Sequence, residues 1–198
     1  MAVTPIFQCT IPAENELLRQ ESRDVPTELF NTPKLRQIIQ DMIDTLDTQS
    51  DGVALAAPQI GILYRIFIVR FDRTLPPLPV ESADTSVSVA TSTKTPAQKP
   101  KADVGVFINP KFVKSSRRRE EMDEGCLSVR GIYGTTYRHD RATVRAQTET
   151  GTFFERGGGG LLAQIFQHET DHLEGILFID HALELTAPKV DTATDTID

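Results

Sequence analysis

The chain has 198 residues, of which 39% are hydrophobic and 25% charged. This length and composition fit one globular domain with a sizeable core. The formal net charge of −7 argues against a nucleic-acid-binding domain. No apolar run approaches the roughly 18 residues that a membrane-spanning helix needs. The first residues lack the basic start and apolar stretch of a secretory signal, so we expect a cytoplasmic protein without membrane or direct nucleic-acid contacts.

The chain contains two cysteines, Cys9 and Cys126. Two are too few for a disulfide scaffold in a chain of this length, and the absent signal implies a reducing compartment. Cys9 has no histidine close in sequence and is interpreted as core filler. Cys126 must be judged together with its neighbours.

The first half of the chain predicts one clear helix and two clear strands. Apolar residues recur at steps of three and four over 33–47, which indicates an amphipathic helix with Thr32 as its cap. Residues 52–61 are too rich in small residues and breakers for a long regular element. Residues 64–71 and 104–110 are rich in Ile, Val and Phe, which is typical of buried strands, and the second strand is expected to end at its proline.

The second half predicts a hairpin and a second helix. Residues 141–157 alternate as a hairpin does, with a turn at the Thr-Gly pair. The glycines of 157–160 are expected to break the chain ahead of a helix over 161–174. The mixed charges from Arg117 to Glu121 are interpreted as a solvated turn.

These elements favour an α+β fold, with mostly antiparallel sheets packed around a central helix at 161–174 and a second helix near the N-terminus. Residues 1–185 are expected to form one catalytic domain. Pro, Ser and Thr fill residues 72–103, which have too little apolar mass to pack and predict a mobile surface insertion. The polar residues 186–198 predict a disordered tail.

The second helix carries the pattern HExxH over residues 168–172. Residues four apart lie on one helix face, so the imidazoles of His168 and His172 can bind one ion. Glu169 then lies close to a water molecule that the ion acidifies. Such a pattern also arises by chance on solvated helices. However, the apolar residues around it make this helix largely buried, and buried polar groups must be paired or bound. The pattern therefore predicts a metal site.

The third ligand decides the class of enzyme. A metzincin peptidase would place a histidine at position 178, but this chain has Phe178, and His181 comes too late. A thermolysin-like peptidase would need a glutamate on a later helix, and little chain remains for one around Glu184. Upstream, Cys126 offers a thiolate. A Cys-His-His set leaves a fourth position open for water, as a catalytic site requires.

Three segments together resemble the peptide deformylase family, whose patterns GxGLAAPQ, EGCLS and HExDH occur in that order. Here they read GVALAAPQ (52–59), EGCLS (124–128) and HETDH (168–172). The resemblance covers most of the chain apart from 72–103 and the tail. It implies a hydrolase that removes the formyl group from the N-terminal methionine of nascent polypeptides and releases formate.

The resemblance also implies a cofactor, partners and site residues. The cofactor would be one divalent ion, Fe²⁺ in the cell with Zn²⁺ or Ni²⁺ in purified protein. The partners would be N-formylmethionyl nascent peptides, with transient ribosome contact by a monomer. Cys126, His168 and His172 would be metal ligands, with Glu169 as general acid and base. The side chain of Gln59 and the backbone N–H of Leu127 would stabilise the oxyanion. The substrate-binding positions would be Gly52, Val53, Ala54, Leu161 and Ile165.

The chain departs from the family pattern in several places. Ala54 stands where the family has glycine, which could distort the substrate edge. Arg130 stands where the family often has proline, and 72–103 is unusually long. The chain ends soon after Leu185, so we expect no long C-terminal helix of the kind that some bacterial members use at the ribosome.

Two other functions stay open at this point. An HExxH metallopeptidase would keep its metal without Cys126. A non-catalytic metal-binding module would need a fourth protein ligand, such as Asp171 or His181.

Overall fold

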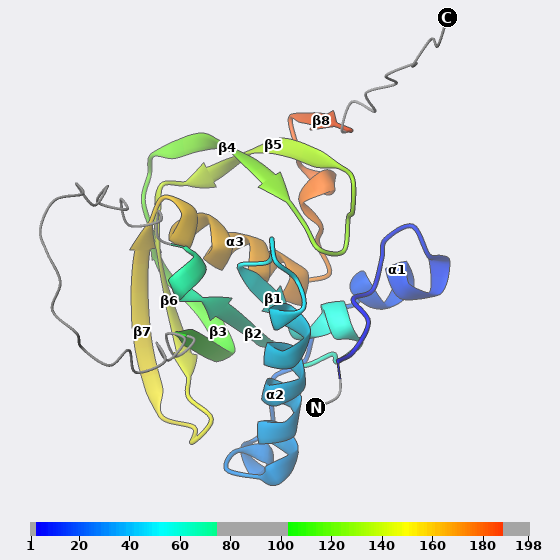
Figure 1. Ribbon diagram of the computed structural model, residues 1–198. Coiled ribbons are helices and arrows are strands. Elements are labelled where there is room, and N and C mark those ends of the chain that lie inside the picture. The colour runs from blue at the N-terminus through cyan, green and yellow to red at the C-terminus, as the bar shows by residue number, and fades with distance from the viewer. Residues whose placement is uncertain (1–2, 75–102, 188–198) are drawn as a thin grey trace, which may run out of the picture.

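The computed structural model describes residues 3–74 and 103–187. Most of the predicted insertion and tail therefore lies outside the described residues. The described part contains two antiparallel sheets and three α-helices, which confirms the α+β class (Figure 1). None of the helices in these two ranges is long and apolar enough to cross a membrane.

The larger sheet has five strands in the order β1-β2-β3-β6-β7. Its strands are β1 (Ala54–Ala56), β2 (Ile66–Arg70), β3 (Val104–Ser115), β6 (Arg141–Gln147) and β7 (Phe153–Gly159). Every neighbouring pair is antiparallel. β2 and β3 are paired, and the N–H of Phe71 donates to the carbonyl of Asp103 at 2.8 Å. The first described range therefore ends, and the second begins, beside the neighbouring ends of β2 and β3.

The smaller sheet has three strands in the order β4-β5-β8. They are β4 (Arg119–Gly125), β5 (Tyr133–His139) and β8 (Glu184–Thr186). Short 3-10 helices connect the larger elements at Thr27–Leu29, Ala57–Ile60, Phe71–Arg73 and Phe178–Asp180. The hairpin predicted over 141–157 is present as β6 and β7, with Gly151 at φ 82° in its turn.

Two helices cover opposite faces of the larger sheet. The α2 helix (Pro33–Asp47) packs on Leu55, Ile66 and Ile68, whereas α3 (Leu161–Leu173) packs on Ala54, Phe67 and Val69. Side chains alternate between the faces of a strand, so β1 and β2 contribute to both clusters and are buried throughout. The predicted cap of α2 is present, because Thr32 Oγ1 accepts from the N–H of Leu35 at 3.2 Å. A short helix, α1 (Pro12–Leu18), precedes them.

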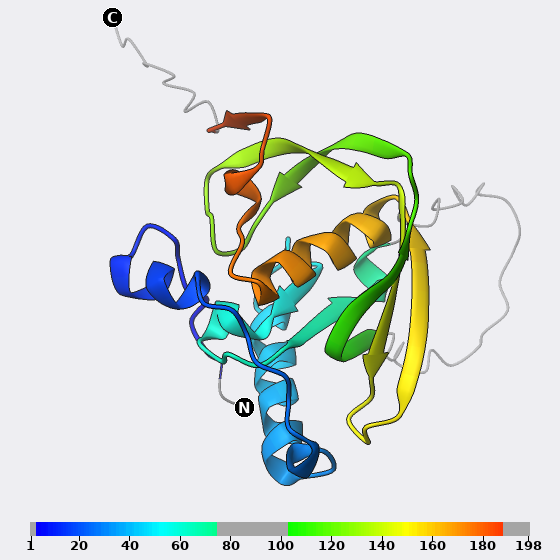
Figure 2. The ribbon, with the colours of Figure 1, turned by 180° about the vertical axis from the view of Figure 1, so that it is seen from behind.

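Helix α3 contacts strands of both sheets. Figures 1 and 2 show it between the sheet of β4 and β5 and the sheet of β1, β2, β3, β6 and β7. It begins after Gly160 and ends before Gly175, whose φ of 72° supplies the left-handed residue expected after a helix. The HExxH helix is thus covered on two sides by sheet.

One strand was predicted too short. The sequence predicted that the strand beginning at Val104 ends at Pro110, but β3 continues to Ser115. The register with β6 shifts between Ile108 and Lys111, which is a bulge that absorbs the missing N–H of the proline. Asn109 adopts φ 50° there, and its side chain accepts from the N–H of Val25 at 2.7 Å. The bulge is therefore anchored from outside the sheet.

Three local predictions were also wrong, the first of them in part. The turn predicted from Arg117 to Glu121 covers only Arg117 and Arg118, which connect β3 to β4; from Arg119 the chain belongs to β4, which pairs with β5. The glycines before α3 do not break the chain until Gly160, because those at 157–159 belong to β7. A Cβ on Gly158 would lie 2.6 Å from Leu162, so glycine there allows α3 to pack closely. Thr186, predicted to lie in the tail, pairs with Tyr133 as part of β8.

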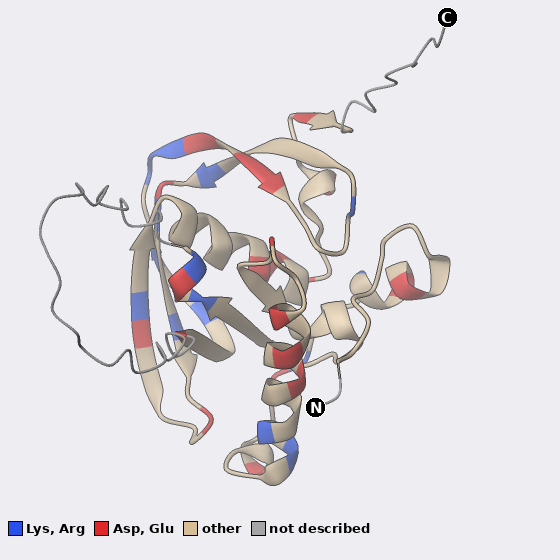
Figure 3. Ribbon diagram, in the orientation of Figure 1, with Lys and Arg blue, Asp and Glu red and all other residues tan. Residues whose placement is uncertain are grey.

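The positions of acidic and basic residues are interspersed along the ribbon in Figure 3, rather than gathered by sign. On β4, for example, Arg119 is followed directly by Glu120 and Glu121.

Candidate active site

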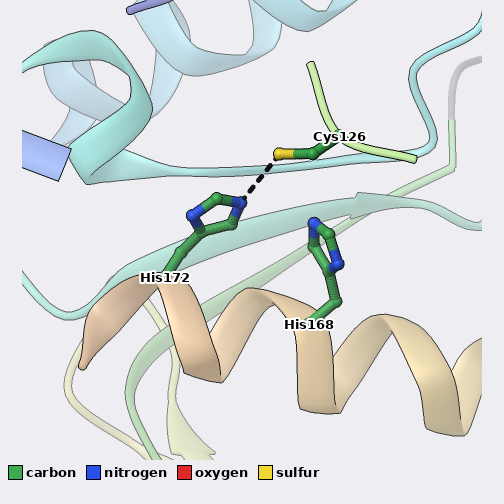
Figure 4. A group of neighbouring side chains, drawn as sticks. All are labelled: Cys126, His168 and His172. Atoms are coloured by element: carbon green, nitrogen blue, oxygen red, sulfur yellow. Dashed lines mark hydrogen bonds between the residues drawn. The ribbon is translucent and has the colours of Figure 1, made fainter. Parts of the chain in front are cut away.

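Three side chains that can bind a metal ion converge between β4 and α3. Cys126 directly follows β4, and His168 and His172 lie one turn apart on α3. Their ligand atoms all lie within 4.8 Å of one another, and Cys126 Sγ is 3.2 Å from His172 Nε2 (Figure 4). The two elements belong to different layers of the fold, so this cluster depends on the packing of α3 against the smaller sheet.

The electrostatics of the cluster favour a thiolate. Burial opposes ionisation of Cys126, but the imidazoles of His172 and His168 outweigh it and hold the pKa of the thiol well below its ordinary value. The N–H of Ser128 also points to the sulfur, at 3.4 Å. A thiolate with two imidazoles is a donor set that divalent transition metals bind well, and the ion replaces the protons of the ligands. The residues present therefore fit a metal ion.

A buried salt-bridge chain orients His168. Glu124 Oε2 lies 3.3 Å from His168 Nδ1, which directs the other ring nitrogen towards the cluster. Arg138 binds the same carboxylate through two hydrogen bonds, at 2.6 and 3.0 Å, and binds Asp171 at 2.7 Å. Burial raises the pKa of Glu124, but His168 and Arg138 outweigh it and hold that pKa well below its usual range. Glu124 is thus an anion that fixes the ring.

This arrangement excludes Asp171 from the ligand set. Its carboxylate is bound by Arg138, and His181 Nε2 lies 3.8 Å from the same carboxylate rather than among the ligands. Within the described residues, the metal-binding group contains Cys126, His168 and His172. Three protein ligands leave a coordination position for water, as catalytic sites do.

Replacing Arg138 with Met should lower metal affinity about 10–100-fold, the usual cost of losing a partner that orients a metal ligand. Glu124 would lose both of its hydrogen bonds from the guanidinium and would no longer hold His168 in place. Competition with a chromophoric chelator measures the affinity. Arg118, whose side chain is 74% exposed, gives the control variant Arg118→Met. Equal affinity in the two variants, both folded by circular dichroism, would contradict this role.

Glu169 follows the first histidine and is buried beside the cluster, with 4% exposure. Within the described part of the chain its Oε2 has no hydrogen-bond partner. Burial raises the pKa of Glu169 to about 7, against the opposing effect of the two histidines. A carboxyl group with a pKa near neutrality can both take up and return a proton at physiological pH.

A cavity of about 310 Å³ opens beside these residues. It is lined by every residue predicted for the site except His172, which lies among the metal ligands: Gly52, Val53, Ala54, Gln59, Cys126, Leu127, Leu161, Ile165, His168 and Glu169. The predicted metal-binding, oxyanion and substrate residues are therefore brought together in one place.

Gln59 is buried and held in a fixed orientation. Its Oε1 accepts from the N–H of Ala56 at 2.8 Å, and its Nε2 donates to Ser128 Oγ at 3.1 Å and lies 3.6 Å from Cys126 Sγ. The amide N–H groups therefore face the sulfur side of the cavity. Within the described residues the N–H of Leu127 has no acceptor, so it is available to a ligand. Both groups can donate to an oxygen atom beside the cluster.

Strand β1 forms the edge of the larger sheet and one wall of the cavity. Val53 and Ala54 line the cavity at the start of this strand. Ala54 has no positive φ, so alanine takes the place of the family's glycine in ordinary extended backbone. The backbone distortion that the sequence analysis expected from Ala54 is absent, because this position does not use the conformational freedom of glycine.

A segment near the N-terminus holds the two motifs together, and sequence reasoning missed it. The N–H of Phe7 donates to the carbonyl of Gln59 at 2.8 Å, and the N–H of Cys9 donates to that of Ser128 at 2.9 Å. Gln8 Nε2 also donates to the carbonyl of Leu127 at 2.9 Å. Cys9 packs against an apolar cluster, in line with the expected filler role. No motif marks these residues, because most of the contacts use backbone atoms.

Comparison with known proteins decides the family. The family model described as polypeptide deformylase matches residues 9–188. The chain belongs to the polypeptide deformylase family. Peptide deformylase 2 of Clostridium acetobutylicum is 37% identical over 172 residues, which cover 87% of this chain and 93% of the relative. The prediction of a peptide deformylase, an enzyme that removes the N-formyl group from nascent peptides, is thereby confirmed.

Solved deformylases share the fold. A crystal structure from Legionella pneumophila is 34% identical with a TM-score of 0.69, and covers 91% of this chain and 86% of that one. A Met-Ala-Ser-bound class I type b deformylase from Acinetobacter baumannii is 28% identical with a TM-score of 0.70, and covers 91% of this chain and 100% of that one.

Proposed function

We propose that this chain hydrolyses the formyl amide of N-formylmethionyl peptides in the cavity beside Cys126, with one divalent ion held by Cys126, His168 and His172. The observation that carries this assignment is the convergence of three possible ligand atoms, a buried carboxyl group and the N–H donors of Gln59 and Leu127 on one cavity. Amide hydrolysis needs each of these parts.

The donor set suits Fe²⁺, Zn²⁺ and Ni²⁺, and we propose Fe²⁺ for the cell. Held by Cys126, His168 and His172, such an ion would supply Lewis-acid chemistry and would make a water molecule easier to deprotonate. Glu124 and Arg138 keep His168 oriented for it.

Glu169 moves the proton in this mechanism. Its carboxylate takes a proton from the attacking water and returns it to the nitrogen of methionine as formate leaves. The buried position of Glu169 supports this role, because a pKa of about 7 suits both transfers. The products are formate and a peptide with a free N-terminus.

Gln59 and Leu127 stabilise the negative charge that develops on the formyl oxygen. The amide of Gln59 is pre-oriented by Ala56 and Ser128, so little reorganisation accompanies the reaction. The N–H of Leu127, beside Cys126, donates from the neighbouring wall of the cavity.

Replacing Gln59 with Leu should lower kcat about 10²–10³-fold, the usual cost of one lost oxyanion donor. KM should change less, because the charge develops after substrate binds. Formate release measures both constants. Ser128→Ala removes one orienting contact but leaves the donor, and should cost much less. A Gln59→Leu enzyme that folds, binds metal and keeps its kcat would contradict the assignment.

The substrate lies against the edge strand. We propose that its backbone adds to β1 along Gly52, Val53 and Ala54, as an extended peptide adds to a sheet edge. Leu161 and Ile165 of α3, with Val53, then form the apolar pocket for the methionine side chain. Backbone pairing accepts most sequences after methionine, which suits an enzyme for many nascent chains.

Further parts of the proposal concern the whole molecule. We propose that α3 is the central helix of one catalytic domain over 1–185. The pairing of β2 with β3, on either side of the predicted insertion, supports a single domain. We also propose a cytoplasmic monomer that contacts the ribosome transiently.

The direct test is release of formate from formyl-Met-Ala-Ser by anaerobically purified protein of measured metal content. We expect turnover that scales with bound metal and stops with a chelator. Cleavage of internal peptide bonds without formate would instead support the metallopeptidase function.

A further inference from the structure

The rim of the substrate cavity contains an ion pair between Arg130 and Asp51. Arg130 donates through Nη1 to Asp51 at 2.8 Å and through Nη2 to the side chain of Gln49. Arg130 and Asp51 line the cavity, whereas Gln49 does not. These contacts join two walls of the cavity. Gln49 and Asp51 lie in the wall that leads into β1, whereas Arg130 follows the segment that carries Cys126.

Burial places this pair at the mouth of the cavity. The side chains of Arg130 and Asp51 are 45% and 61% exposed, whereas Ile165 and Glu169 at the other end are buried. A peptide whose formyl group reaches Glu169 can therefore leave the cavity past this pair. On that path the residues after methionine would meet Arg130.

A second arginine, Arg73, binds the same segment, 49–52, through its backbone. Arg73 Nη1 donates to the carbonyls of Gln49 and Gly52, at 2.9 and 2.7 Å. The segment from Gln49 to Gly52 is thus fixed through its backbone by Arg73 and through its side chains by Arg130. A fixed wall gives Arg130 a defined position over the mouth.

The guanidinium has hydrogen-bonding capacity left. It carries five N–H donors, and the contacts to Asp51 and Gln49 use only part of them. Asp51 also balances its charge, so the group can bind a neutral acceptor rather than select an acidic side chain. An extended peptide presents such acceptors as backbone carbonyls at its exposed side.

We propose that Arg130 is a specificity-determining residue that binds a backbone carbonyl of the residue after methionine. It thereby favours peptides over substrates that end at methionine. This inference rests on the proposed function, since it assumes that formylmethionyl peptides enter this cavity.

The test compares formyl-Met-Ala-Ser, formyl-Met-Gly-Gly and formyl-Met-amide in steady-state formate release. Arg130→Ala should raise KM about tenfold for both tripeptides, as expected for a lost hydrogen bond from a charged group, with kcat unchanged. KM for formyl-Met-amide should stay the same. Arg130→Lys should recover part of the loss, because one charged donor remains over the mouth.

The exposed Arg118 supplies the control variant Arg118→Ala, which should leave all three KM values unchanged. Exposed ion pairs contribute little to stability, so the melting temperature of Arg130→Ala should stay near that of the parent enzyme. An unchanged KM for the tripeptides, or an equal rise for the amide, would overturn the proposal. An inactive parent enzyme would overturn the proposed function instead.

Discussion

Replacing Glu169 with Gln should lower kcat for formate release about 10²–10⁴-fold, the usual contribution of a general acid–base residue. The variant should still bind its metal, because Glu169 is not among the three ligands. The substitution keeps the shape of a side chain that is 4% exposed, so the core should be undisturbed. Formate release and metal analysis on the same sample measure the two effects separately.

Glu174 provides the matched control for this experiment. It lies at the end of the same helix but pairs with Arg65 on the surface, at 2.7 Å. Glu174→Gln should keep full activity. If Glu169→Gln were as active as Glu174→Gln, another group would have to move the proton.

Replacing Cys126 with Ala should remove both the metal and the activity. The thiolate is one of the three proposed ligands, and two imidazoles alone would leave a much weaker site. Formate release should fall to background, and metal analysis should find little ion after dialysis. An HExxH peptidase would behave differently, because its metal would not depend on this cysteine.

Cys9→Ala is the natural control, since it removes the other cysteine of the chain. Cys9 packs in an apolar cluster and contacts Ser128 through its backbone N–H, which alanine retains. The variant should keep metal and turnover. A Cys126→Ala protein with full metal content would argue against the proposed ligand set.

The cluster of Cys126, His168 and His172 could be predicted because its two histidines form a local pattern. His168 and His172 are four apart on one helix, and the family motif places Cys126 with them. The α2 helix could be predicted for the same reason, since its apolar period and its Thr32 cap both depend on residues close together in sequence.

The rest of the site depends on contacts that no local pattern encodes. The salt bridge of Glu124 and Arg138 joins two strands, β4 and β5. These strands were not predicted, because the charged residues on their outer faces obscure the alternation of apolar residues. Arg130 was recognised only as a departure, because its contact with Asp51 links distant segments. The length of β3 was underestimated because a bulge at Asn109 tolerates the proline that follows it.

The contacts of residues 7–9 also bear on the folding of the enzyme. Gln8 and Leu127 are separated by 119 positions in the chain, and Cys9 and Ser128 by as many, whereas Phe7 and Gln59 are closer in sequence. Such long loops are costly to close and are expected to form late in folding. A growing chain would carry Gln8 and Cys9 without these partners until Leu127 and Ser128 had been synthesised.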